Sequence, residues 1–254
     1  MLFIGKIVFV FLLVCFHNLF SFAQQNQIND YTVIRYDYIL HGGALLHTNG
    51  FGLDVQYMLN RKVNKNLVFN LDITSLKHPK ETKVINPIYD DAKAYIYGKL
   101  NAAIPVRLGI GNQFILADKE IYNGIRLTFN YSLGPSLTLL KPEYLNFIYR
   151  DPSTNKGYLK IEMFDPTNIW HLNQGNIYGG TSFFKGFEKV TARMGGFLKL
   201  HFGFEWGDYE EHFRIIETGV IIDAFPEPLP IFAFIENKYV FVNLFVNLNI
   251  GRRW

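Results

Sequence analysis

The last stretch of the sequence, residues 239–254, reads YVFVNLFVNLNIGRRW. The even-numbered positions up to 250 are all aliphatic, whereas Asn243, Asn247 and Asn249 occupy odd-numbered positions. Alternation with a period of two is typical of a β-strand whose two faces meet different surroundings. The run is longer than the roughly five or six residues usual for strands, and it ends on an aromatic residue, Trp254. Both properties favour a strand of a membrane-spanning β-barrel.

The same alternation recurs in seven other runs of the sequence. They lie at about 33–47, 51–60, 67–74, 104–114, 125–139, 193–206 and 212–224. Segments of roughly ten residues, with one apolar and one polar face, are the signature of a transmembrane β-barrel. The predicted fold class is therefore all-β: an eight-stranded antiparallel transmembrane β-barrel with long extracellular loops.

The links between the predicted strands alternate in length, except that the first link, Thr48-Asn49-Gly50, is tight on the side of the long loops. Three are short, at 60–66, 117–123 and 207–211, and three are long, at 77–101, 141–190 and 225–238. Short turns on the periplasmic side and long loops outside are typical of outer-membrane barrels. The pattern predicts a multi-pass protein of the Gram-negative cell outer membrane with both termini in the periplasm. The longest link is rich in aromatic residues, which predicts a large extracellular loop or a small folded cap.

The N-terminus predicts export. Lys6 precedes an apolar run, and Ser21-Phe22-Ala23 follows it as a small-x-small cleavage site. These features are typical of a signal peptide that is removed after Ala23. The only cysteine, Cys15, lies within it, so we expect a mature chain without thiol chemistry. The predicted parts are a signal peptide at 1–23, a periplasmic N-terminal segment at 24–32 and the barrel at 33–254.

The charge balance excludes some classes of partner. The formal net charge is +3 for the full sequence, and removal of Lys6 lowers it by one. This balance gives no basis for a nucleic-acid partner. His78, Asp165 and His171 fall in the long links but lack the spacing of metal ligands. We therefore predict no metal and no cofactor.

The inward-facing positions carry nearly equal numbers of both charges. The cations are Arg35, Arg107, Arg126, Arg193 and Lys199, and the anions are Asp37, Asp54, Asp72, Glu205, Glu217 and Asp223. Eight strands enclose a space that side chains just fill, and unpaired buried charges are costly there. We therefore expect paired charges that fill the interior, which disfavours a small channel without excluding it.

A second alternative is an enzyme that modifies lipid A. His47-Thr48-Asn49 resembles in composition the active site of barrel-type lipid A deacylases, in which a His and a Ser lie two residues apart. Adjacent residues on a strand point to opposite faces, so His47 is poorly placed to activate Thr48. Asn49-Gly50 is also a strong signal for a tight hairpin. We predict no catalytic residues.

The link at 225–238 is the predicted docking site for partners. Three prolines stiffen it, and five apolar residues follow in a row at 231–235. The four predicted partner-binding residues of this link are Leu229, Ile231, Phe232 and Phe234. Exposed apolar patches mark contact sites with protein or lipid. The alternative is that this stretch packs under the longest loop. Trp254, the terminal aromatic residue, is similar to the signal that the barrel-assembly machine recognises in outer-membrane proteins.

Five short motifs are spread over most of the chain. They are HTNGFG at 47–52, YGKLN at 97–101, KPEYL at 141–145, GTSFFKGFE at 180–188 and the terminal GRRW. Together they resemble a family of small outer-membrane β-barrels from Bacteroidota. The resemblance implies an accessory barrel of the Bacteroidota barrel-assembly complex, whose outer loops contact surface-exposed lipoproteins. It carries over no catalytic residues.

The expected function is that of a non-enzymatic scaffold or accessory subunit of an outer-membrane protein complex, with a role in outer-membrane protein assembly. The extracellular loops would dock the partners. The expected partners are outer-membrane lipids, other outer-membrane proteins or surface lipoproteins, and the barrel-assembly machine. The alternatives are a lipid A-modifying hydrolase and a small channel.

Overall fold

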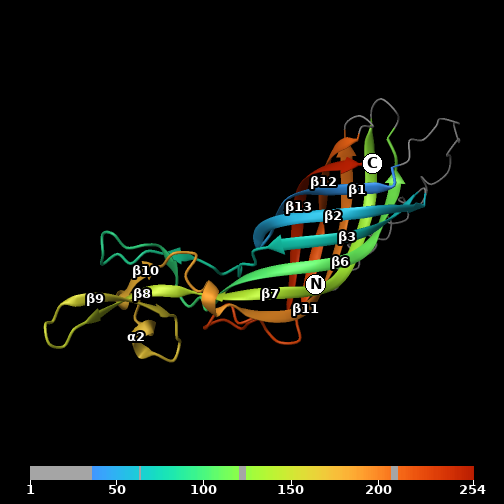
Figure 1. Ribbon diagram of the computed structural model, residues 1–254. Helices are drawn as coiled ribbons and strands as arrows, with labels where there is room; N and C mark the ends of the chain where they lie inside the picture. The colour runs from blue at the N-terminus through green and yellow to red at the C-terminus, as the bar shows by residue number, and fades with distance from the viewer. Residues whose placement is uncertain (1–35, 63, 120–123, 207–210) are drawn as a thin grey trace, which may run out of the picture. The chain divides into compact units, whose positions relative to one another are not determined.

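The computed structural model describes residues 36–62, 64–119, 124–206 and 211–254. Eight of its strands form a closed antiparallel barrel (Figure 1). They are β1 (Tyr38–His47), β2 (Gly50–Lys62), β3 (Lys65–Thr74), β6 (Asn101–Ala117), β7 (Ile125–Pro142), β11 (Thr191–Trp206), β12 (His212–Ala224) and β13 (Val240–Arg253). Around the barrel the order is β1-β13-β12-β11-β7-β6-β3-β2. The predicted all-β, eight-stranded antiparallel barrel is confirmed.

Several predictions concern residues outside this described part of the chain. They are the signal peptide at 1–23, the periplasmic N-terminal segment at 24–32 and the first few residues of the first predicted strand, up to Arg35.

The barrel is closed by the pairing of its first and last strands. β1 and β13 run antiparallel from Ile39↔Arg253 to His47↔Phe245. Beyond the ladder, Trp254 N donates to Tyr38 O and Trp254 O accepts from Tyr38 N, both at 3.0 Å. Closure leaves no barrel strand with an unpaired edge, which would otherwise attract other chains.

The alternation along β13 is the one that the sequence predicts. Val242, Leu244 and Leu248 are exposed on the outer surface, and Asn243 and Asn247 are buried inside the barrel. The other barrel strands follow the same rule, which gives the barrel an aliphatic and aromatic outer face. Among the described residues, no helix is both long enough and apolar enough to cross a membrane.

The long links fold into structure of their own. A three-stranded sheet has the order β10-β8-β9, with β8 at Tyr144–Arg150, β9 at Gly157–Met163 and β10 at Ile177–Gly180. A second pair consists of β4 (Lys83–Val84) and β5 (Tyr95–Ile96), and short helical turns are α2 (Ile169–Leu172), η1 (Gln174–Asn176) and η2 (Phe187–Lys189). We call residues 77–100 and 143–190 the loop unit. It has its own core, formed by Tyr95, Leu145, Phe147, Phe164 and Ile177.

A separate apolar cluster joins the barrel to the loop at 225–238. Leu76, Ala103, Leu140, Phe225, Leu229, Ile231, Phe232 and Phe241 form it. The loop is also tied by backbone hydrogen bonds, because Leu100 N donates to Ile231 O at 2.8 Å and Ala233 N donates to Gly98 O at 2.9 Å. The loop at 225–238 is thus packed against the base of the loop unit.

Candidate functional site

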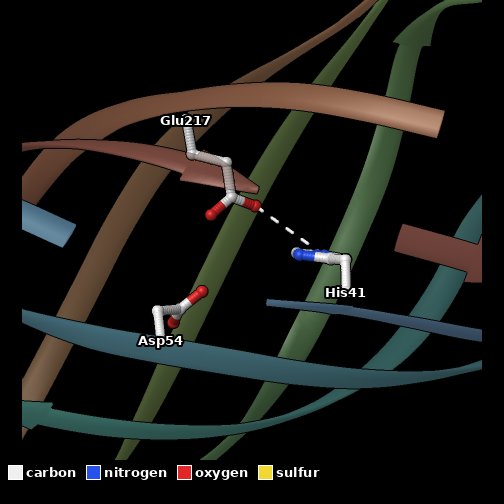
Figure 2. A group of neighbouring side chains, drawn as sticks. All are labelled: His41, Asp54 and Glu217. Carbon is white, nitrogen blue, oxygen red and sulfur yellow. Dashed lines mark ion pairs between the residues drawn. The ribbon is translucent and has the colours of Figure 1, made fainter. Parts of the chain in front are cut away.

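The centre of the barrel interior is organised around Glu217 on β12. Its Oε2 atom accepts hydrogen bonds from the side-chain amides of Gln56 (2.9 Å), Asn247 (3.1 Å) and Asn249 (3.0 Å). Its Oε1 atom faces His41 Nε2 at 3.9 Å and His201 Nε2 at 3.4 Å. Figure 2 shows His41 and Glu217 directed toward one another, with the Asp54 carboxylate beside them. The asparagines of the last strand therefore hold a buried carboxylate.

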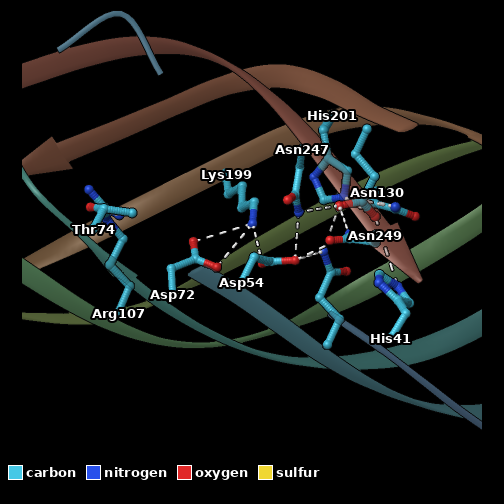
Figure 3. Close-up of polar contacts among 12 residues, drawn as sticks. His41, Asp54, Asp72, Thr74, Arg107, Asn130, Lys199, His201, Asn247 and Asn249 are labelled. Atoms are coloured by element: carbon cyan, nitrogen blue, oxygen red, sulfur yellow. Dashed lines mark hydrogen bonds and ion pairs between the residues drawn. The ribbon is translucent and has the colours of Figure 1, made fainter. Parts of the chain in front are cut away.

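Lys199 on β11 lies in the same layer of the interior. Its Nζ atom lies 2.7 Å from Asp54 Oδ2 and 3.1 Å from Asp72 Oδ1, and all three side chains are fully buried. Figure 3 shows this ammonium group between the two carboxylates. The two carboxylates come from the neighbouring strands β2 and β3, and the cation comes from the far side of the barrel.

Arg107 on β6 forms the next ion pair. Its Nε and Nη2 atoms donate to the two carboxylate oxygens of Asp223 at 2.6 and 2.8 Å, and Nη1 donates to Thr74 Oγ1 at 3.0 Å. A guanidinium group that binds both oxygens of a carboxylate is a strong and directional pair. This pair therefore spans the barrel between β6 and β12.

A further cluster surrounds Glu205 at the end of the barrel where β13 finishes. Arg253 Nη2 donates to Glu205 Oε1, and Lys119 Nζ lies 2.8 Å from the same oxygen. Arg126 binds Asp118 at 2.7 Å and lies 3.7 Å from Glu205. Sequence reasoning missed Lys119 and Arg253, although continuing the odd-numbered face of the last strand would have placed Arg253 inside.

Most predicted interior charges are found inside the barrel, and two are not. Arg193 is exposed, because it lies near the start of β11 beside the loops, and it pairs with Glu227 at 2.9 Å. Asp37 is exposed at the opposite end, just before β1. These two predictions were wrong because the alternation of the strands continues beyond the enclosed part of the barrel. Arg35 lies outside the described residues.

The geometry around His47 is that of a hairpin. His47 Nε2 lies 3.0 Å from the Ser75 carbonyl oxygen, and His47 Nδ1 accepts from Asn49 N at 3.3 Å. Both ring nitrogens therefore contact backbone groups. The Thr48 hydroxyl donates to Asn243 Oδ1 at 3.4 Å instead of facing the imidazole. This arrangement contains no His–hydroxyl pair of the kind that activates a nucleophile.

Within the loop unit, Glu162 is the centre of a second polar cluster. Tyr149 Oη donates to Glu162 Oε2 at 2.5 Å, and Lys160 Nζ lies 2.6 Å from Glu162 Oε1. His171 Nδ1 accepts from Asp165 N at 3.1 Å, so that Nε2 is free to donate to Glu162 Oε2 at 3.2 Å. His171 and Asp165, which the sequence predicts to be separate surface residues, therefore lie next to one another. The contact joins the His171 ring to the Asp165 backbone, so the two side chains are not placed as joint metal ligands. His78, the third residue of that set, lies near Phe232.

This cluster shifts the pKa values of its members. Burial raises the pKa of the Glu162 carboxyl, but hydrogen bonds from Lys160, Tyr149 and His171 outweigh it and lower that pKa to about 2. Burial, together with the hydrogen bond to Glu162, raises the pKa of Tyr149 to about 12. At neutral pH we therefore expect an ionised Glu162 that accepts hydrogen bonds from a neutral phenol.

An open pocket of about 610 Å³ lies beside this cluster. It is lined by Tyr144, Ile161, Glu162, Met163, Phe164, Asp165, Pro166, Asn168, His171 and Lys189. The lining combines apolar side chains with carboxylates and a lysine.

The loop unit also exposes several large apolar side chains. Phe184 is 78% exposed and Ile169 is 83% exposed. The Phe183 ring contacts the Phe184 and Phe187 rings at centroid distances of 5.8 and 5.6 Å. Among the described strands, β9 pairs with β8 alone, and its Tyr158, Leu159, Ile161 and Met163 are exposed. We call these exposed side chains the loop apolar surface: Tyr158, Leu159, Ile161, Met163, Ile169, Phe183, Phe184 and Phe187.

The predicted partner-binding residues do not share one environment. Leu229, Ile231 and Phe232 are at most 5% exposed and belong to the cluster that joins the loop to the barrel. Phe234 is 52% exposed, although its ring also stacks on Tyr97 at 5.6 Å. Of the four, only Phe234 is exposed, and the other three pack against barrel residues that include Ala103, Leu140 and Phe241. Trp254, the predicted assembly signal, is half-exposed and stacks on Tyr38 at 6.0 Å.

The comparisons with known proteins concern structure. The sequence matches no protein-family model and no curated protein. Among solved structures, the chain is similar to Ail, the attachment invasion locus protein of Yersinia pestis, with a TM-score of 0.42, 10% identity and coverage of 87% of this chain and 100% of that one. It is also similar to Neisserial surface protein A, NspA, with a TM-score of 0.40, 7% identity and coverage of 85% and 96%. At these scores neither likeness bears on what the chain does.

Proposed function

We propose that this chain is an outer-membrane β-barrel that presents the loop unit outside the cell as a docking surface for partner proteins. The observation that carries the proposal is the combination of an apolar outer face on the barrel with a folded loop unit whose own surface is also apolar. The two apolar surfaces call for different partners. Lipid would cover the first, and protein the second.

The barrel wall has the properties that a bilayer requires. All the barrel strands are paired on both sides, which satisfies their backbone groups without water. Aromatic residues cluster at the end where the chain terminates, because Tyr38 stacks on both Tyr57 (6.3 Å) and Trp254 (6.0 Å). Such belts are typical of the membrane–water boundary. This end would face the periplasm, with both termini there, and the loop unit would lie outside.

The filled interior supports a scaffold better than a channel. The ion pairs of Arg107 and Lys199 cross the middle of the barrel. The hairpin geometry of His47 gives no support to a lipid A hydrolase. In this proposal the barrel is an anchor and the loops carry the function, as an accessory subunit of an outer-membrane protein complex engaged in outer-membrane protein assembly. Its partners would be other outer-membrane proteins or surface lipoproteins.

The loop apolar surface fits such partners because its aromatic side chains are already ordered. Phe183 packs edge-on against Phe184 and Phe187, and Lys141 Nζ lies 5.3 Å from the centre of the Phe183 ring. Rigid aromatic side chains lose little entropy on binding and are enriched among residues that dominate binding energy.

The test is co-purification from membranes in mild detergent, followed by identification of the proteins that accompany the barrel. We expect a stable complex with wild type and at least a tenfold loss of partner with Phe183→Ser/Phe184→Ser, since each buried side chain contributes roughly 1.5–3 kcal/mol. The matched control is Ile85→Ser/Ile88→Ser, which changes two other exposed apolar side chains of the loop unit. The proposal fails if wild type purifies alone, or if both double variants retain the same partners.

A further inference from the structure

Three ligand-type side chains converge in the barrel interior. His41 on β1, Asp54 on β2 and Glu217 on β12 are at most 2% exposed. One donor atom from each, a ring nitrogen and two carboxylate oxygens, lies within 4.8 Å of the other two (Figure 2). β1 and β2 are the two strands of one hairpin, whereas β12 is distant in sequence, so closure of the barrel brings Glu217 to the other two side chains.

Within the described part of the chain, three polar atoms of this cluster lack hydrogen-bond partners, whereas both Asp54 oxygens and Glu217 Oε2 have them. Neither ring nitrogen of His41 has one among the described residues, and the same is true of Glu217 Oε1. Buried polar groups are nearly always hydrogen-bonded, and each exception calls for an explanation. Here an imidazole and a carboxylate oxygen, both without such a partner, face one another at 3.9 Å.

The charges around the cluster do not balance either. When all three are ionised, Asp54, Asp72 and Glu217 supply three negative charges, whereas Lys199 supplies one positive charge. Arg107 does not supply a second positive charge to this cluster, because its guanidinium group is bound to both oxygens of Asp223. Two negative charges thus remain in a fully buried layer, where uncompensated charge is very costly. One divalent cation would balance them.

We propose that His41, Asp54 and Glu217 form a structural site for one divalent transition-metal ion of the zinc type. Histidine nitrogen and carboxylate oxygen are the ligands that Zn²⁺ takes at about 2.0–2.2 Å, which puts tetrahedral ligands about 3.3 Å apart. His201 Nε2 lies 3.4 Å from Glu217 Oε1 and borders the same space. Small side-chain movements therefore suffice to complete the set. The site departs from the sequence-based prediction of no metal.

Apolar side chains flank the site on both sides along the barrel. On β1, His41 lies between Ile39 and Leu45, and on β12, Glu217 lies between Ile215 and Ile221. Ile39 and Ile215 belong to one buried apolar cluster, and Leu45 and Ile221 belong to another. An ion held between two such layers would enter while the barrel closes and would exchange slowly afterwards.

The experiment measures the zinc content of the full-length protein, purified from membranes in detergent and dialysed against EDTA. We expect about one zinc ion per chain in wild type, released by the chelator only after unfolding. His41→Gln and Glu217→Gln remove one ligand each at similar volume, and each should lower the zinc content at least tenfold. The control, His47→Gln, changes a histidine of the same strand outside the cluster and should keep the wild-type content.

Folding of each variant is checked by the heat-modifiable band on a gel, and only folded protein is compared. Should both variants fail to fold, wild type unfolded in denaturant with EDTA is refolded with Zn²⁺ or with chelator alone. The proposal expects zinc that resists EDTA after refolding. Wild type without zinc, or zinc that EDTA removes from folded protein, overturns it. A zinc content equal to that of wild type in both variants also overturns the proposal.

Discussion

Arg107 and Asp223 face one another across the barrel interior and are joined by two parallel hydrogen bonds of 2.6 and 2.8 Å. Both side chains are fully buried, so neither charge has water as a second partner. Arg107→Met should therefore destabilise the barrel by about 3–5 kcal/mol, because it leaves Asp223 charged and unpaired. Urea unfolding in lipid vesicles measures the change. Arg107→Met/Asp223→Leu should recover most of it, and a double variant as unstable as the single one would contradict this account.

Trp254 should act in assembly and contribute little to stability. Its backbone is held by Tyr38 at both N and O, independently of the side chain. We expect Trp254→Ala to lower the amount of barrel in the outer membrane severalfold, whereas the purified variant should refold in detergent to wild-type yield. Ile250→Ala, which truncates an exposed side chain of the same strand, is the control for both assays. Equal loss in the two assays would mean that Trp254 is a packing residue.

Phe232 should hold the loop at 225–238 in place. Its ring is buried and lies 5.4 Å from the His78 ring. Phe232→Ala should weaken the local structure by about 3–5 kcal/mol, as removal of a buried aromatic ring does. Limited proteolysis should then cut this loop faster while the barrel band stays intact. Phe234→Ala, at a half-exposed position, should have a smaller effect on cleavage. The reverse ranking would show that the burial of Phe232 does not matter.

The Glu162 cluster should make the loop unit sensitive to acid. The pKa of this carboxyl is about 2 in the folded chain and has a reference value of 4.5. A carboxyl whose pKa is lowered on folding stabilises the fold above the reference value and loses that contribution as the pH falls toward the folded value. We therefore expect the loop unit to loosen between about pH 4.5 and about pH 2.

Fluorescence of Trp170 reports this change, since its indole nitrogen donates to Ile148 O at 3.1 Å and its ring stacks on Tyr149. Trp206→Phe and Trp254→Phe remove the other two tryptophans. In this background Glu162→Gln should show a flatter acid profile than the parent. An unchanged profile would show that a group other than Glu162 causes the acid sensitivity.

His47→Ala should leave lipid A unchanged. Both ring nitrogens of His47 are used by backbone groups of the hairpin, and Thr48 turns its hydroxyl to Asn243. Mass spectrometry of lipid A from cells that express wild type or the variant makes the comparison. A mass difference between the two would favour the hydrolase.

The barrel could be predicted from the sequence because inside and outside impose opposite chemistry on successive residues. In the last strand, Val242 meets the outer surface and Asn243 the interior, so periodicity alone identifies both faces. The same rule does not show at which residue a strand leaves the enclosed part of the barrel. Arg193 continues the polar face of its strand but lies beside the loops. The alternation is the same in both parts of the strand, so the sequence alone does not separate a residue inside the barrel from one beside the loops.

The loops were harder to predict because they lack a repeating period. Residues 229–235 are mostly apolar, and neither spacing nor composition separates a buried stretch from an exposed one. Residues far away in sequence determine whether such a stretch is buried. Leu229 and Ile231 are buried in one cluster with Leu76, Ala103 and Leu140. The His41–Asp54–Glu217 cluster was missed for a similar reason, since its spacing in sequence carries no ligand motif.

The near-continuity of two strands has a mechanical consequence. β7 ends at Pro142 and β8 begins at Tyr144, and Glu143 N between them donates to Leu100 O at 2.9 Å. A pull on the sheet of the loop unit therefore runs along β7, which pairs with β6 on one side and β11 on the other. Such a load shears many hydrogen bonds together and does not open them one at a time. A partner that tugs on the loops would thus pull on the barrel wall itself.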